Sequence, residues 1–198
     1  MEILTTYFDQ YQEFITEYYW LALLMTMILP FIEAIIPTLP LGAMIGINLS
    51  ALSQAFGGTI GTLLTILLSV LGSFLGMLFI FLIIRKTLSN KYRHKIEDHE
   101  VGKKFLNIAN ESNLGLMFVF LANPFLPSSI LNYALSFTSI KLKNYIGITI
   151  ASRFVIILFF VFLGSLFDVQ SHPLNVLWLS LFYVILFLIL LILKKKHH

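Results

Sequence analysis

The sequence contains no cysteine, few charged residues and, before Arg85, no lysine or arginine at all. The absence of cysteine excludes a small secreted domain held together by disulfides. Charged residues make up 12% of the 198 residues, whereas soluble globular domains carry about 25%. Hydrophobic residues make up 58%, so the chain is neither disordered nor a solvated globular enzyme.

In place of charges the chain has long apolar runs, several of them near the roughly 20 residues that a helix needs to cross a bilayer. They cover residues 20–37, 41–56, 59–84, 114–140, 145–167 and 174–193. These runs predict an all-α integral membrane protein. Ahead of them, aromatic residues at helical spacing favour an interfacial helix at 1–19 or, equally, the first turns of a longer span: Tyr7, Tyr11, Phe14 and Tyr18.

The thirteen lysines and arginines indicate the orientation of the chain, because positive charge collects on the cytoplasmic side of a membrane. Segment 85–113 carries seven basic and four acidic residues, so we expect a cytoplasmic amphipathic segment there. The lysines at 194–196 predict a cytoplasmic C-terminus. The loop 168–173 has an acid and no lysine or arginine, and should lie outside.

The uncharged stretch 114–140 should enter and leave the membrane through the same face. It lies between segment 85–113 and the next basic residue, Lys141, and both should be cytoplasmic. Its middle contains Pro124 and Pro127, which cannot continue a helix, and the arms on either side are too short to cross about 30 Å. A re-entrant hairpin satisfies these conditions.

A second break of the same form lies at Pro37 and Pro40, within residues 20–56. The acidic N-terminus belongs outside and the span 59–84 runs inward, so residues 20–56 must also return to their own side. Both breaks read P-x-L-P, and the spans that follow them, 59–84 and 145–167, run in opposite directions. In transporters, broken helices of such inverted repeats meet near the midplane and form the substrate site.

The expected fold is therefore an inverted-topology repeat of two re-entrant hairpins, each followed by a transmembrane helix. It forms a single membrane domain at 1–198, made up of an interfacial helix (1–19), a hairpin (20–56), a transmembrane helix (59–84), a cytoplasmic segment (85–113), a second hairpin (114–140) and two further transmembrane helices (145–167 and 174–193).

Two charged residues lie inside apolar runs, where an unpaired charge costs several kcal/mol. Glu33 precedes the first break, and Arg153 lies near the middle of 145–167. Glu33 would titrate a proton or bind a cation, or else cap backbone groups freed by the prolines. Arg153 would bind a phosphate through paired hydrogen bonds, or form an ion pair with Glu33 that holds the two repeats together.

Polar residues surround the second break, at Asn123, Ser128, Ser129 and Asn132. They either satisfy backbone groups exposed by the prolines or, with half-helix N-termini, donate hydrogen bonds to an anionic headgroup. Small residues at four-residue spacings predict close helix packing: Gly57, Gly61, Gly72 and Gly76. No catalytic, metal-binding or cofactor motif occurs, so we expect no enzyme activity, metal or cofactor.

The residues around the two breaks resemble the DedA family, also described as the VTT-domain or SNARE-associated Golgi protein superfamily. The resemblance covers about residues 28–167. The first hairpin, "FIEAIIPTLPLGAMIGIN", has the early Glu and closely spaced prolines of the family. The second, "ANPFLPSSILNYALSFTSIKLKNYIGITIASR", has its P-x-x-P, Asn-Tyr and small-residue pattern, and "FLGSLF" resembles the Gly-Ser that closes the next span.

The resemblance implies opposed hairpins and movement of lipid between leaflets, of undecaprenyl phosphate or phospholipids in bacterial members. Glu33 matches the Glu of the family's first hairpin. A second acidic residue of many members is replaced by Leu41-Gly42-Ala43, and an Arg of the second hairpin would fall on Leu121. Arg153 is a candidate substitute for that missing cation, and the chain looks closer to the shorter bacterial branch.

We therefore expect a lipid flippase or scramblase of the bacterial plasma membrane, with or without proton coupling. A proton- or cation-coupled small-solute transporter and a non-transporting membrane scaffold are the alternatives. The expected partners are membrane lipids, and protons if transport is coupled, with no nucleic acid; a homo-oligomer is compatible with the sequence.

Overall fold

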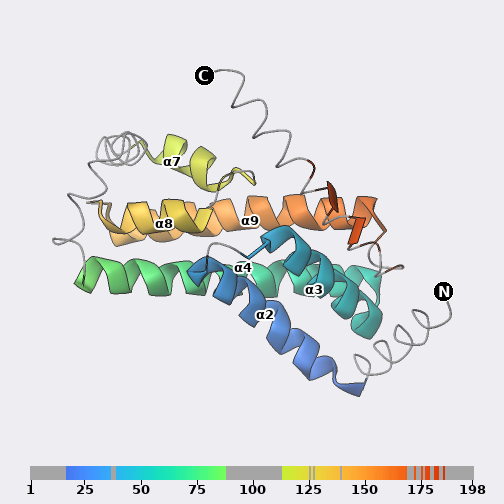
Figure 1. The fold of residues 1–198 in the computed structure, drawn as a ribbon. Helices are drawn as coiled ribbons and strands as arrows, with labels where there is room; N and C mark the ends of the chain where they lie inside the picture. Colours follow the sequence, from blue (N-terminus) through green and yellow to red (C-terminus); the bar gives the residue numbers. More distant parts are fainter. Residues whose placement is uncertain are drawn as a thin grey trace. The chain divides into compact units, whose positions relative to one another are not determined.

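The computed structural model describes residues 17–36, 39–87 and 113–168, except 125, 127 and 139, and isolated positions between 172 and 185. This part of the chain is helical with short connections and contains no strand (Figure 1). Most of the predicted interfacial helix, cytoplasmic segment and last transmembrane helix lies outside the described residues. The helices are α2 (Tyr19–Ile35), α3 (Leu41–Phe56), α4 (Gly58–Thr87), α7 (Leu114–Leu121), α8 (Ser128–Ser136) and α9 (Leu142–Leu166).

Two helices are long and apolar enough to cross a membrane. α4 has 30 residues and α9 has 25, with mean hydropathies of 2.7 and 2.5 in their most apolar windows. At 1.5 Å per residue they measure about 45 Å and about 37 Å, more than the roughly 30 Å of a bilayer's hydrocarbon core. Large apolar side chains stay exposed along both, including Leu63, Leu67 and Leu71 on α4 and Phe154 and Phe162 on α9. Such faces suit contact with lipid tails.

Two prolines, Pro40 and Pro124, lie at the predicted interruptions of the helices. α2 ends at Ile35, and Pro40, with φ −80° and ψ 95°, precedes the first residue of α3. α7 and α8 are separated by residues 122–127, which include Pro124. Pro30 is accommodated inside α2. Pro37 and Pro127 lie outside the described residues.

Gly57 does not have the helix-packing role that its spacing predicts. It ends α3 with φ +83°, a left-handed conformation that glycine adopts without strain, and a Cβ built there would meet no atom within 4 Å. Its contribution is the sharp turn between α3 and α4.

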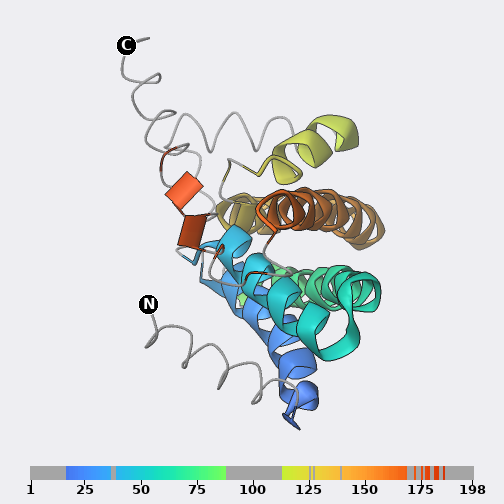
Figure 2. The ribbon, with the colours of Figure 1, turned by 90° about the vertical axis from the view of Figure 1, so that its right-hand side faces the viewer.

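The chain divides into two compact units, and the first comprises residues 1–29, 40–69 and 158–198. Within it, α3 runs antiparallel to the first part of α2, and the start of α4 packs on α3 (Figure 2). Asn48 Nδ2 lies 3.5 Å from Thr26 O. Gly61 permits the close approach of α4, since a Cβ there would collide with Leu52 O.

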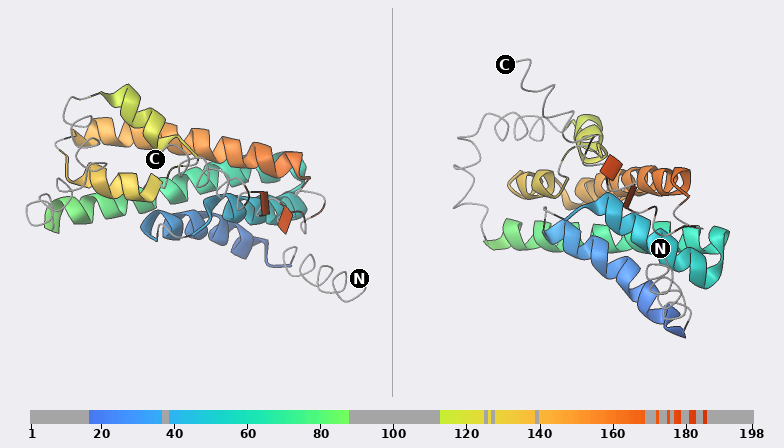
Figure 3. Two further views of the ribbon diagram at one scale, coloured as in Figure 1. Left: turned by 45° about the horizontal axis from the view of Figure 1, so that its top comes forward. Right: turned by 45° about the vertical axis from the view of Figure 1, so that its right-hand side comes forward.

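The second unit comprises residues 30–39 and 70–157. α8 lies beside α4 and the first half of α9 (Figure 3). Gly76 brings α4 against the end of α2, because a Cβ there would collide with Phe31 O. Gly72 is buried on the same helix. The apolar core of this unit consists of Ala34, Met77, Phe81, Met117, Leu121, Leu135, Ile140, Tyr145 and Ile148.

Candidate functional site

The two charges predicted to stand out in apolar runs meet inside the second unit. Glu33 lies two residues before the end of α2, and Arg153 is about 16 Å along α9 from its start. Arg153 Nη1 lies 3.9 Å from Glu33 Oε2. Arg153 is 0% exposed and Glu33 5%. Glu33 and Arg153 therefore form a buried ion pair between helices far apart in the sequence.

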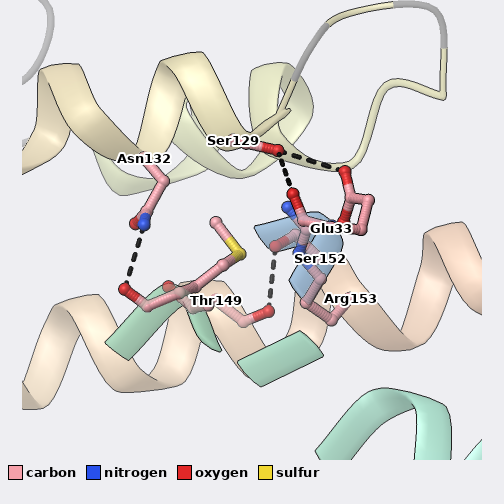
Figure 4. Close-up of polar contacts among 7 residues, drawn as sticks. Glu33, Ser129, Asn132, Thr149, Ser152 and Arg153 are labelled. Carbon is pink, nitrogen blue, oxygen red and sulfur yellow. Dashed lines mark hydrogen bonds and ion pairs between the residues drawn. The ribbon is translucent and has the colours of Figure 1, made fainter. Parts of the chain in front are cut away.

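α8 contributes the third member of the site, Ser129 (Figure 4). Its hydroxyl donates to Glu33 Oε1 at 3.1 Å and lies 3.4 Å from Glu33 O. Ser129 and its neighbour Ser128 are both buried in the first turn of α8. Backbone N–H groups of a first helical turn have no partner within the helix, so hydroxyl and backbone donors lie close together at this end of α8.

Tyr133, which the sequence analysis did not select, also connects α8 to the end of α2. Its hydroxyl donates to Ile35 O, one of the carbonyls that the end of a helix leaves without an internal partner. Tyr133 follows Ser129 by four residues, so both side chains lie on one face of α8. The four-residue spacing from Ser129 is the sequence feature that could have indicated Tyr133. An aromatic residue within an apolar run, however, is not distinguished from its neighbours by its type.

Asn132 uses both ends of its amide within the protein. Its Nδ2 donates to Met77 O at 2.9 Å (Figure 4), and its Oδ1 accepts from the hydroxyl of Tyr145 at 2.7 Å. The ring of Tyr145 stacks on Phe81 with centroids 3.7 Å apart. Asn132 therefore connects α8 with α4 and α9. Tyr145 is a further residue that the sequence analysis missed.

Four polar atoms of the ion pair have no hydrogen-bond partner among the described residues. Among the described residues, Nε, Nη1 and Nη2 of Arg153 and Oε2 of Glu33 are buried without a hydrogen-bond partner. A guanidinium has five N–H donors and no means of losing its charge. A buried donor without an acceptor costs about 1–3 kcal/mol. The site can therefore accept a ligand with several acceptor oxygens, such as a phosphate or carboxylate.

The other predicted residues lie around this centre or apart from it. Asn123 and Pro124 are half-buried in the turn that follows α7. Pro40 precedes α3, in the first unit. No group of three or more His, Cys, Asp or Glu side chains that could hold a metal occurs in the described part of the chain.

Known proteins similar to this chain identify its family. The VTT domain matches residues 47–166, which include Ser129 and Arg153. The "Uncharacterized membrane protein YhjE" of Bacillus subtilis (strain 168) is 28% identical over 163 residues, which are 82% of this chain and 72% of that protein. No solved structure matches the chain significantly. Because the domain match covers more than half of the sequence, the chain belongs to the VTT-domain family of membrane proteins, also called the DedA family.

Proposed function

We propose that this membrane protein moves a phosphate-bearing lipid, such as undecaprenyl phosphate or a phospholipid, between the leaflets of the bacterial plasma membrane. The observation that carries the proposal is Arg153, whose fully buried guanidinium has no hydrogen-bond partner among the described residues. A permanent charge with five free donors requires an acceptor. A lipid phosphate offers the paired oxygens that a guanidinium binds best.

The surroundings of Arg153 supply further donors for the same headgroup. Ser128 and Ser129 lie in the first turn of α8, where the helix dipole and unpaired N–H groups favour an anion. The hydroxyl of Ser129 already binds one carboxylate, that of Glu33. In this proposal Arg153 compensates the negative charge of the phosphate, and Ser128 and Ser129 donate hydrogen bonds to its remaining oxygens.

The exposed apolar side chains of α4 and α9 are compatible with acyl or prenyl tails that remain in the bilayer. A headgroup near Arg153 would then lie about halfway along α9, at a depth near the middle of the hydrocarbon core. The energetic barrier to lipid exchange is the passage of the headgroup through this region. A buried site that binds phosphate would lower that barrier.

The proposal includes the topology expected from the charges. The two interrupted pairs, α2–α3 and α7–α8, would be re-entrant hairpins that enter from opposite faces. Segment 85–113 and the C-terminus would be cytoplasmic, and the N-terminus outside.

The proposal is tested by reconstituting the purified protein into vesicles that carry a trace of fluorescent lipid. A quencher added outside reports the rate at which inner-leaflet lipid reaches the outer leaflet. We expect faster exchange of phosphate-bearing lipids than in empty vesicles. No acceleration for any lipid class would refute the proposal. Entry of inorganic phosphate without lipid exchange would instead identify a small-solute transporter.

A further inference from the structure

We infer that Glu33 occupies the place of the headgroup phosphate at Arg153, as an internal competitor that the lipid must displace. The inference rests on the proposed function and concerns the regulation of the same site. It assigns Glu33 a role in limiting how tightly the headgroup is held.

Glu33 uses the donors that a phosphate would need. Its two carboxylate oxygens face two different donors: Ser129 Oγ lies 3.1 Å from Oε1, and Arg153 Nη1 lies 3.9 Å from Oε2 (Figure 4). A carboxylate and a phosphate both present paired, negatively charged oxygens, and arginine binds both through the same fork of N–H groups. The two anions are therefore alternatives at Arg153.

Glu33 occupies the site incompletely. A separation of 3.9 Å exceeds hydrogen-bond length, and all three guanidinium nitrogens are without a hydrogen-bond partner among the described residues. The carboxylate thus balances the charge of Arg153 but leaves its N–H donors unused. A phosphate close enough to accept from two of these donors would gain interactions that Glu33 does not make.

As a consequence, the lipid headgroup and Glu33 can replace each other at Arg153. Without a competitor, a buried arginine would hold a phosphate tightly, and the headgroup would leave slowly. When Glu33 returns to Arg153, it compensates the charge that the departing phosphate leaves behind. Glu33 should therefore weaken binding while it accelerates release.

The experiment compares binding of short-chain phosphatidic acid to wild type, Glu33→Gln and Glu33→Asp, in detergent and phosphate-free buffer. Glutamine keeps the shape of the side chain without its charge. Aspartate keeps the charge but is shorter by one bond, about 1.5 Å, so it reaches Arg153 less well. Glu17→Gln removes an equal charge from an exposed position and serves as the control. A parallel titration with inorganic phosphate separates a lipid headgroup from the free anion.

We expect Glu33→Gln to bind phosphatidic acid at least tenfold more tightly than wild type, which corresponds to about 1.4 kcal/mol. Glu33→Asp should also bind more tightly, and Glu17→Gln should match wild type. If Glu33→Gln proves unstable without ligand, a larger ligand-induced rise in its melting temperature than in wild type reports the same gain.

Wild-type affinity in Glu33→Gln, with wild-type binding and transport intact, would overturn the inference and leave the proposed function standing. Wild-type affinity in Glu33→Asp alone would overturn it too, because Glu33 would then act only through its charge. If wild-type protein neither binds phosphatidic acid nor moves any phosphate lipid, the proposed function fails and the competitor role fails with it.

Discussion

Neutralising Glu33 should destabilise the ligand-free protein more than neutralising Arg153, and neutralising both should restore much of the loss. The reason is an asymmetry between the two buried charges. Glu33 can take up a proton when its partner is removed, and it keeps its contact with Ser129. Arg153 cannot lose its charge, and no hydrogen-bond acceptor reaches its nitrogens in the part of the chain that the structure describes.

The magnitude follows from the separation of the pair. Two unit charges 3.9 Å apart attract each other by about 4 kcal/mol at an effective dielectric constant of about 20. Removal of one partner of a buried pair costs about 3–5 kcal/mol, while replacement of both is often neutral. For a chain of this length, one kcal/mol shifts the melting temperature by roughly 2–4 °C. Glu33→Gln should thus melt about 6–20 °C below wild type.

The assay is thermal unfolding in detergent and phosphate-free buffer for Glu33→Gln, Arg153→Met and the double variant. We expect the melting temperature of Arg153→Met to fall by less than half as much as that of Glu33→Gln. The melting temperature of the double variant should lie at least halfway back from that of Glu33→Gln to that of wild type. Lys143→Met, which removes an exposed charge from the same helix, should change little. Additive losses in the double variant would refute the reasoning, because they would show that the two side chains do not interact.

Three further predictions follow from individual contacts. Gly76→Ala should destabilise the protein measurably in the same melting assay, because its Cβ would collide with a backbone carbonyl of α2. Gly147→Ala serves as the control and should be tolerated, since a Cβ there meets nothing within 4 Å. Equal losses of melting temperature in the two variants would contradict this. Tyr133→Phe should lower stability by about 1 kcal/mol through its lost hydrogen bond, and wild-type melting would show that the bond contributes nothing. Since the chain has no cysteine, single introduced cysteines report topology without background labelling. In oriented vesicles, a cysteine at Lys143 should be labelled from inside and a cysteine at Gln170 from outside. Labelling of both from one side would contradict the proposed orientation.

The helical class and the two principal charges are accessible from sequence because both depend on composition along the chain. Apolar runs without charge predict helices in a membrane, and any charge within such a run is conspicuous because burying it is costly. Glu33 and Arg153 were identified as candidates in this way. That they lie 3.9 Å apart depends on how α2 and α9 pack, so from the sequence an ion pair is only one of two alternatives for Arg153.

Other parts of the site carry too little local signal to be predicted. Tyr133 and Tyr145 sit among apolar residues, and only tertiary packing places their hydroxyls against Ile35 O and Asn132. Gly57 fits a small-residue spacing, yet its positive φ shows that it makes a turn. A spacing of four residues describes which residues share a helical face, but it does not say where the helix ends.

The central claim is that the guanidinium of Arg153 binds the phosphate of a lipid as the headgroup crosses the membrane. It is tested most directly by the rates at which phosphatidic acid and an uncharged diacylglycerol exchange between the leaflets of vesicles. The vesicles contain wild type, Arg153→Gln or Lys143→Gln, which removes an exposed charge and serves as the control. The account predicts that wild type and Lys143→Gln accelerate exchange of phosphatidic acid, and that Arg153→Gln slows it to the rate in empty vesicles. Exchange of phosphatidic acid at the wild-type rate in folded Arg153→Gln would contradict it.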